Sequence, residues 1–311
     1  MSYWDNKEIL VTGGSGFLGS FVVEKLSQNG VLRKNIRVPR SSSCDLRIFE
    51  NCQRAVSNRD LVIHLAASLG GIEYNRNYPG TLFYDNSIMG IQLMEAARLE
   101  GVDKFVVIGS VCSYPKEVPI PTKEEHLWVG YPEESNAAYG LSKKMLLVQA
   151  QAYKQEFDFN AIFLLLANMY GPRDNFDLQK SHVIPALIRK MLEAERKSEN
   201  VVLWGTGKAT RDFLYVEDAA EAILLATEEY DDSEPLNIAS GSEISIKDLA
   251  SLIQGLTGYT REIVWDTSKP DGQPRRLFDI TRARSKIGFE AKTSLEKGLR
   301  RTVEWYLENA V

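Results

Sequence analysis

The stretch EILVTGGSGFLGSFVVEKL at residues 8–26 joins a short apolar run to three spaced glycines and then to apolar residues at helical spacing. Residues 9–11 predict a buried strand, and the glycines predict a turn from that strand into a helix. The first glycine permits a tight turn, the second lets a pyrophosphate approach the backbone, and the third allows close helix–strand packing. An ordinary glycine-rich turn is the alternative, but the strand–turn–helix context favours a dinucleotide site. We expect this segment to bind a cofactor through Gly13, Gly14, Ser15, Gly16, Phe17, Leu18 and Gly19.

Tyr139 and Lys143, four residues apart, form the second informative feature. They lie in AAYGLSKKMLLVQA at residues 137–150, where apolar residues among good helix formers predict a helix. Residues at i and i+4 share a helix face, with Cβ atoms about 5–6 Å apart. A lysine beside the tyrosine hydroxyl would lower the pKa of the phenol, so that it could exchange a proton near neutral pH. A chance surface pair is the alternative for this motif on its own.

The composition is that of a globular protein. The chain has 311 residues, of which 44% are hydrophobic, and a net charge of −5. Because no basic block stands out, nucleic acid is not expected as the main partner. No run of 18 apolar residues and no apolar N-terminal signal region occur, so neither a membrane span nor export is expected. The three cysteines and three histidines show no metal-type spacing, which favours a metal-free protein in a reducing cytoplasm.

Strand and helix patterns alternate through the first half of the chain. Strands are expected at residues 8–12, 36–39, 61–65, 103–109 and 160–166, and helices at 17–29, 47–57, 82–99 and 138–156. This alternation predicts an α/β fold with a Rossmann-type doubly wound parallel sheet. The later pattern consists of helices at 183–195, 217–228, 245–257 and 294–308 and one strand at 201–204. We expect an NADP-binding domain at residues 1–170 and a smaller C-terminal α/β substrate domain at 171–311, with later segments returning to the first sheet.

The end of the second expected strand bears on the choice of cofactor. An acidic residue at that position binds the ribose 2′-OH of NAD, whereas a cation suits the 2′-phosphate of NADP. Here the strand runs into VPRSSSCDL, which offers Arg40 and Ser41 and no carboxylate before Asp45. NADP(H) is therefore favoured, with Asp45 and Leu46 near the adenine; a solvated Arg40 with no such role is the alternative.

Further motifs identify a family resemblance that covers residues 8 to about 308. They are HLAASLGGI (64–72), GSVCSYP (109–115), NMYGPRDNF (168–176), SHVIPALIRK (181–190), VVLWGTGKATRDFLYVEDAA (201–220) and SKPDGQPRR (268–276). With the glycine motif and YGLSK, they resemble the extended short-chain dehydrogenase/reductase family and, within it, the GDP-L-fucose synthases. The SHVIPAL and KPDGxPR segments are the most specific to that group.

The resemblance implies roles for particular residues. The family's catalytic triad falls on Ser110, Tyr139 and Lys143, its epimerisation base on Cys112 and its acid on His182. Residues implied in cofactor binding are Lys143, Asn168 and His182, and those implied in holding the GDP-sugar are Lys190, Trp204, Arg211 and Asp271. A small buried cysteine at 112 and a histidine that merely begins a helix at 182 are the alternatives. The chain departs from the family pattern at Val111, at Leu166–Ala167 and at Lys190, which puts fine substrate geometry in doubt but removes no catalytic group.

The implied activity is NADPH-dependent 3,5-epimerisation and 4-reduction of GDP-4-keto-6-deoxy-D-mannose to GDP-L-fucose. A related enzyme acting on a dideoxy or heptose GDP-4-keto-sugar is one alternative. A non-catalytic NADP-binding sensor is the other, although such proteins can lack the tyrosine or the lysine that this chain keeps. The family also implies a homodimer, formed through the helices expected near 82–99 and 138–156.

Overall fold

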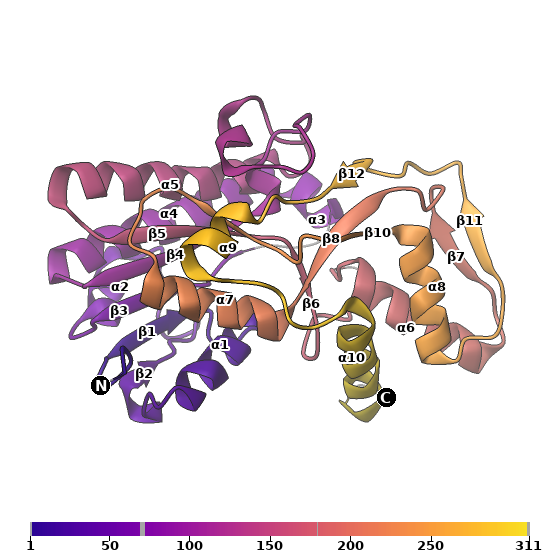
Figure 1. The fold of residues 1–311 in the computed structure, drawn as a ribbon, viewed down its shortest axis with the longest axis horizontal. Helices are drawn as coiled ribbons and strands as arrows, with labels where there is room; N and C mark the ends of the chain where they lie inside the picture. The colour runs from indigo at the N-terminus through magenta and orange to yellow at the C-terminus, as the bar shows by residue number, and fades with distance from the viewer. Residues whose placement is uncertain (1, 69–71, 179, 310–311) are drawn as a thin grey trace.

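The structure, a computed structural model, describes residues 2–68, 72–178 and 180–309. Residues 69–71 of the HLAASLGGI segment lie outside the described residues. The molecule has two adjoining parts, each built around sheet and helices (Figure 1). The larger part contains a six-stranded parallel sheet, and its strands in spatial order are β2 (Ile36–Arg37), β1 (Ile9–Thr12), β3 (Leu61–His64), β4 (Lys104–Ser110), β5 (Ala161–Leu166) and β9 (Leu236–Ile238).

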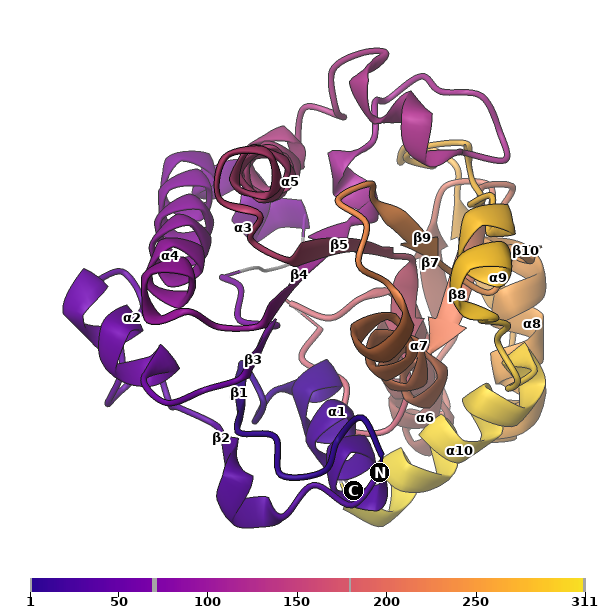
Figure 2. The same cartoon turned by 60° about the vertical axis from the view of Figure 1, so that its left-hand side comes forward.

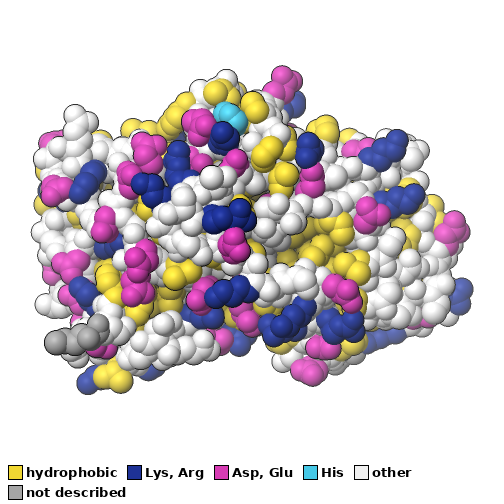
Figure 3. All heavy atoms as spheres, in the orientation of Figure 1, with side chains coloured by type: hydrophobic (Ala, Val, Ile, Leu, Met, Phe, Trp, Pro, Cys, Tyr) yellow, Lys and Arg dark blue, Asp and Glu magenta, His cyan; other side chains and the backbone are white. Residues whose placement is uncertain are grey.

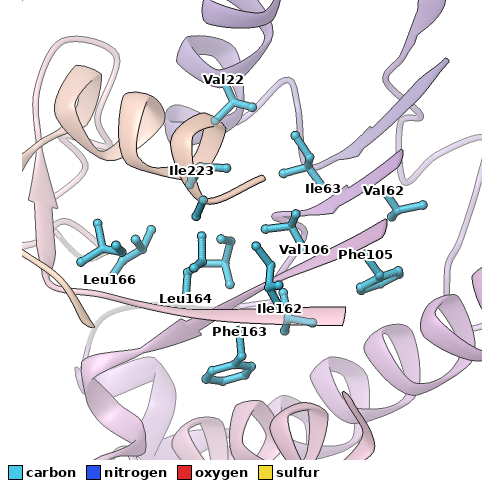
Figure 4. Close-up of a cluster of buried hydrophobic side chains, with 14 of the residues drawn as sticks. Val22, Val62, Ile63, Phe105, Val106, Ile162, Phe163, Leu164, Leu166 and Ile223 are labelled. Carbon is cyan, nitrogen blue, oxygen red and sulfur yellow. The ribbon is translucent and has the colours of Figure 1, made fainter. Parts of the chain in front are cut away.

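Helices cover both faces of this sheet (Figure 2). One face carries α2 (Phe49–Val56), α4 (Pro79–Glu100) and α5 (Ala137–Phe157), and the other carries α1 (Phe17–Gln28) and α7 (Val216–Glu229). Strands buried on both faces are apolar throughout instead of alternating, and all six residues of β5 are buried. Figure 4 shows Phe163 of β5 pointing away from the side on which Leu164 approaches Ile223 of α7. The sheet is therefore the centre of a two-sided apolar core.

The smaller part holds the second core. Its strands are β6 (Asn168–Tyr170), β8 (Thr210–Tyr215), β10 (Glu243–Ser245) and β12 (Arg275–Arg276), which form one sheet, and β7 (Val201–Trp204) with β11 (Ile263–Asp266), which form another. Its helices are α6 (Val183–Lys197), α8 (Ile246–Thr257) and α10 (Leu295–Asn309). Ile188 of α6, Leu249 of α8 and Leu299 of α10 are each fully buried in a common cluster. The remaining elements are α3 (Ile72–Asn77), α9 (Thr281–Ile287) and the short helices η1 (Arg33–Asn35), η2 (Val111–Ser113) and η3 (Glu124–Trp128).

The fold class expected from the sequence is confirmed. The elements expected in the first half are present, with α4 beginning three residues early and β2 ending before Val38. Six strands were not expected: β6, β8, β9, β10, β11 and β12. Most span two to four residues, which is too short to show a period in sequence. The expected return to the first sheet occurs through β9, while the division of the chain at residue 170 remains a prediction.

Candidate active site

The glycine turn after β1 has no room for side chains. A Cβ at Gly13, whose φ is +70°, would lie 2.8 Å from the amide nitrogen of Ala66, and one at Gly19 would lie 2.1 Å from the carbonyl oxygen of Gly13. Among the described residues, no side chain caps the start of α1, where Ser15 and Gly16 are exposed. Phe17 is half-buried, and Gly14 and Leu18 are buried. This bare helix N-terminus fits a dinucleotide pyrophosphate, because its free N–H groups and dipole favour an anion.

The loop after β2 presents a cation rather than a free carboxylate. Arg40 is exposed, as is Ser41, and the turn is closed by the amides of Ser43 and Cys44, which donate to the carbonyl of Arg40 at 3.0 and 2.9 Å. The carboxylate of Asp45 is already bound by Arg47 at 2.8 Å, and hydrogen bonds from Arg47 lower its pKa. Leu46 is buried in the core, so only its backbone could face an adenine. The loop suits a 2′-phosphate better than a 2′-hydroxyl.

Ser110 and Cys112 lie where β4 ends. Ser110 is the last residue of the strand, and its hydroxyl oxygen accepts a hydrogen bond of 3.2 Å from the amide of Cys112 in η2. The hydroxyl of Ser113 donates to the carbonyl of Gly140 at 3.1 Å, which attaches η2 to the first turn of α5. Both Ser110 and Cys112 remain half-buried. The structure thus brings the strand end that carries the thiol against the helix that carries Tyr139.

Tyr139 and Lys143 share one face of α5, as their spacing predicts. The ammonium nitrogen of Lys143 lies 5.9 Å from the centroid of the Tyr139 ring. Lys143 is 2% exposed, and burial lowers its pKa to about 8. Burial also raises the pKa of Tyr139, with a further contribution from Cys112. The sequence predicted a lowered pKa for this phenol, whereas in the structure the pKa is raised, because burial removes the phenolate from water.

Asn168 and His182 come from the smaller part of the molecule. Asn168 begins β6 and is half-buried. His182 is the residue that precedes α6, and its backbone carbonyl accepts from the amide of Ala186 at 3.1 Å. Its ring is exposed, but the protein around it reduces its hydration and lowers its pKa. This direction opposes the expected role of an acid at neutral pH, since the imidazole holds its proton less firmly than usual.

The four residues expected to hold the GDP-sugar lie in the smaller part, on α6, β7 and β8 and in the loop after β11. Lys190 is half-buried on α6, and Trp204 ends β7 with 68% of its surface exposed. Asp271 follows β11, and both of its carboxylate oxygens are engaged, at 2.5 Å by the amide and at 2.8 Å by the hydroxyl of Thr206. These hydrogen bonds lower the pKa of Asp271. Asp271 therefore holds the turn that follows Trp204 in place.

Arg276 is a candidate that the sequence did not single out. It lies directly opposite Arg211 in the parallel pairing of β12 with β8. Burial, and secondly the charge of Arg276, lower the pKa of Arg211 to about 10. Within the described residues neither guanidinium forms an ion pair with a carboxylate. Two adjacent cations that lack a counter-charge favour an anionic ligand such as a diphosphate. The two arginines in KPDGQPRR are visible in the sequence. The register of β12 on β8, which places Arg276 beside Arg211, is not.

Arg276 also reaches the catalytic turn. Its guanidinium donates to the carbonyl of Val111 at 3.2 Å, next to Cys112. The larger and smaller parts therefore meet at η2. Among the described residues, no cluster of three potential metal ligands occurs, and no helix is both long and apolar enough to cross a bilayer. On the face in Figure 3, basic and acidic side chains are interspersed, without a large patch of one sign.

The chain is similar to known proteins over nearly its full length. The sequence profile of the NAD dependent epimerase/dehydratase family matches residues 9–239. The chain is 39% identical to GDP-L-fucose synthase of Sinorhizobium fredii over 98% of its own length and 97% of that protein. It is similar to the solved structure of a GDP-L-fucose synthetase from Naegleria fowleri bound to NADP (TM-score 0.87, 29% identity, 98% and 95% of the two chains). It is also similar to a GDP-mannoheptose C4 reductase from Campylobacter jejuni with NADP bound (TM-score 0.88, 26% identity, 97% and 98%).

Proposed function

The chain belongs to the GDP-L-fucose synthases within the NAD dependent epimerase/dehydratase family, and we propose that it converts GDP-4-keto-6-deoxy-D-mannose to GDP-L-fucose by 3,5-epimerisation and NADPH-dependent 4-reduction. One observation carries the proposal. The strand end with Ser110 and Cys112 is joined through Ser113 and Gly140 to the helix turn with Tyr139. An acid–base thiol and a reductase tyrosine are therefore held next to each other.

Reduction of the 4-ketone needs a proton as well as a hydride. NADPH supplies the hydride to C4 when bound. We assign the proton to Tyr139, whose pKa is raised by burial, so that the phenol keeps its proton until negative charge develops on O4. Lys143, buried at 5.9 Å from the ring, is positioned to stabilise the phenolate that remains. Ser110 can donate a second hydrogen bond to O4.

Epimerisation uses the acidity that the 4-ketone gives to the protons on C3 and C5. A base must remove each proton and an acid must return one from the opposite face of the sugar. We propose Cys112 as the base, since its free thiol is only half-buried at the end of β4 and cysteine sulfur is a reactive proton acceptor, and His182 as the acid. An anionic substrate next to His182 would raise its pKa and offset the loss of hydration caused by the surrounding protein. Tyr139 and Ser110 would stabilise the enolate through O4.

The nucleotide part of the substrate fits the smaller part of the molecule. Arg211 and Arg276, side by side without counter-charges among the described residues, together with Lys190, suit a diphosphate. The exposed ring of Trp204 offers a face for stacking a purine, with the Asp271 carboxylate fixing the adjacent turn. We therefore propose that residues 171–311 form mainly the GDP-sugar domain and residues 1–170 the NADP domain.

A second candidate is reduction of a GDP-4-keto-heptose. The similarity in fold to the Campylobacter heptose reductase supports it, although at a lower identity than the fucose synthase relative. We also propose a homodimer through α4 and α5, whose outer faces expose Tyr84, Met145 and Val148. The three cysteines are unpaired thiols, which supports a cytoplasmic location.

The test is solvent exchange at the sugar with a matched pair of cysteine variants. Wild-type protein, Cys112→Ser and Cys44→Ser are given GDP-4-keto-6-deoxy-D-mannose and NADPH in D2O, and products are identified by NMR. Wild-type and Cys44→Ser proteins should form GDP-L-fucose deuterated at C3 and C5. Cys112→Ser should exchange little, because a serine hydroxyl is a far weaker acid than a thiol, and should release a 6-deoxy product with uninverted centres. Wild-type reduction of only a heptose substrate would favour the second candidate, and full exchange by Cys112→Ser would remove Cys112 as the base.

A further inference from the structure

Asn237 is a fully buried polar residue on β9, and both its side-chain amide and its backbone N–H form hydrogen bonds. Its side-chain nitrogen donates to the carbonyls of Thr122 and Asp279, both bonds lying between 2.9 and 3.1 Å. Its side-chain oxygen accepts from the hydroxyl of Tyr114 at 2.6 Å. Its backbone amide donates to the carboxylate of buried Glu124 at 2.9 Å. Three segments distant in sequence, around Tyr114, Thr122–Glu124 and Asp279, therefore converge on one residue.

One of these segments is the turn that carries Cys112. Tyr114 closes that turn, since its amide donates to the carbonyl of Val111 at 3.2 Å. The Tyr114 ring is 3% exposed and packs against Phe278 with centroids 5.2 Å apart. With its ring enclosed and its hydroxyl bound to Asn237, Tyr114 has one available orientation. The C-terminal end of the turn is thereby fixed to β9.

Another of these segments leads to the paired arginines. Leu277 directly follows Arg276, and its carbonyl accepts from the amide of Thr122 at 2.8 Å. The amide of Asp279, two residues later, donates to the carbonyl of Thr122 at 2.9 Å, and the carbonyl of Asp279 accepts from the side-chain nitrogen of Asn237. Since Arg276 itself binds the carbonyl of Val111, the Cys112 turn is held from two directions. Both supports depend on segments that Asn237 connects.

The sheet register places Asn237 level with the end of β4. Gly109, Leu165 and Asn237 occupy one row across β4, β5 and β9. Gly109 immediately precedes Ser110, so Asn237 lies in line with the strand end from which the catalytic turn departs. By contrast, Tyr139 and Lys143 are placed by α5, on a different element. A change at Asn237 or Tyr114 should therefore displace the thiol more than the tyrosine–lysine pair, although α5 contacts η2 at Gly140.

We propose that Asn237, acting through Tyr114, is a positioning residue for epimerisation that holds Cys112 at the reacting carbons. The inference rests on the proposed function. A buried polar group is rigid when all of its hydrogen bonds are satisfied, and a displacement of about 1 Å at a reacting group can cost a large factor in rate. The epimerisation half of the reaction should depend on this network more than substrate or cofactor binding does.

Tyr114→Phe tests the proposal, because it removes one hydroxyl and retains the packed ring. Tyr230→Phe is the matched control: Tyr230 is 3% exposed and belongs to the same core, and its hydroxyl donates to the carbonyl of Glu234 at 2.9 Å. For each protein we would measure the rate of deuterium uptake at C3 and C5 in D2O, the KM for the GDP-sugar, the dissociation constant of NADPH and the melting temperature. Asn237→Ala is a second variant whose fold would first be checked by circular dichroism.

The expected result is a loss of exchange rate on the order of tenfold in Tyr114→Phe, with KM and the NADPH dissociation constant within about twofold of wild type. Tyr230→Phe should lower the melting temperature to a similar extent and exchange at the wild-type rate. Equal exchange rates in the two variants would overturn the positioning role while leaving the proposed function intact. Absence of exchange in the wild-type protein would instead refute the proposed function.

Discussion

Gly140 lies against the backbone of Cys112. A Cβ at Gly140 would be 2.1 Å from the carbonyl oxygen of Cys112, closer than any real side chain could approach. Gly140 directly follows Tyr139 on α5, whereas Cys112 belongs to η2 at the end of β4. The missing side chain therefore allows the two halves of the candidate active site to touch.

We expect Gly140→Ala to separate η2 from α5 and to lower turnover on the order of 100-fold while the protein still folds. Gly255→Ala is the matched control, since Gly255 also lies in a helix and a Cβ there would meet nothing within 4 Å. It should keep full turnover and gain about 0.5–1 kcal/mol in free energy of unfolding. Steady-state kinetics of both variants measure turnover, and urea denaturation measures their free energy of unfolding. Normal turnover in Gly140→Ala would show that the contact is not required.

Tyr139→Phe should keep NADPH binding and lose most reduction. The phenol is the assigned proton donor, and removal of a general acid costs on the order of 10²–10⁴-fold in rate. Tyr153→Phe is the control on the same helix, where the hydroxyl donates to Glu95 at 2.8 Å away from the site. NADPH oxidation followed at saturating substrate, with NADPH affinity measured by fluorescence, tests the prediction. Reduction at the wild-type rate in Tyr139→Phe would exclude the tyrosine from proton transfer.

The pH dependence of reduction should reveal the charge of Lys143. Because burial lowers its pKa to about 8, the ammonium is charged below that pH and neutral above it. If the cation stabilises the Tyr139 phenolate, kcat should be constant from pH 6.5 to 7.5 and then fall, approaching about tenfold per pH unit. The measurement is kcat for NADPH oxidation between pH 6.5 and 10 in buffers of constant ionic strength. A flat profile through pH 9.5 would show that the charge is not needed.

Arg40→Ala should weaken NADPH and leave NADH unchanged. A hydrogen-bonded arginine–phosphate contact is worth about 1.5–3 kcal/mol, so the KM for NADPH should rise about tenfold or more. Lys34→Ala removes another exposed cation just before β2 and serves as the control. The ratio of kcat/KM for the two cofactors is the quantity to compare. An unchanged ratio in Arg40→Ala would assign the 2′-phosphate contact to another residue.

Sequence reasoning succeeded where a local pattern carries the structure. The strand, glycine turn and helix of residues 8–26 and the i, i+4 placement of Tyr139 and Lys143 depend on near neighbours, and both are present. It failed for β9 and the other short strands, because their existence depends on pairing with distant segments rather than on a period of their own.

The same distinction applies to the candidate site. The pairing of Arg276 with Arg211 requires the register of β12 on β8, which no local pattern contains. The raised pKa of Tyr139 depends on how deeply the first turn of α5 is enclosed, and helical spacing says nothing about enclosure. Chemistry that arises from residue type was therefore predictable, whereas chemistry that arises from burial and long-range contact was not.

The late position of β9 in the chain has a consequence for synthesis on the ribosome. A nascent chain that ends after β5 leaves the apolar residues Leu164–Leu166 with unpaired backbone groups on one side, which is a template for association with other chains. Those groups are paired only when Leu236–Ile238 emerges, after α6, β7 and β8 of the smaller part have been made. The N-terminal region therefore cannot complete its six-stranded sheet as an early unit, and the end of β5 stays open to other chains until about three quarters of the protein has been made.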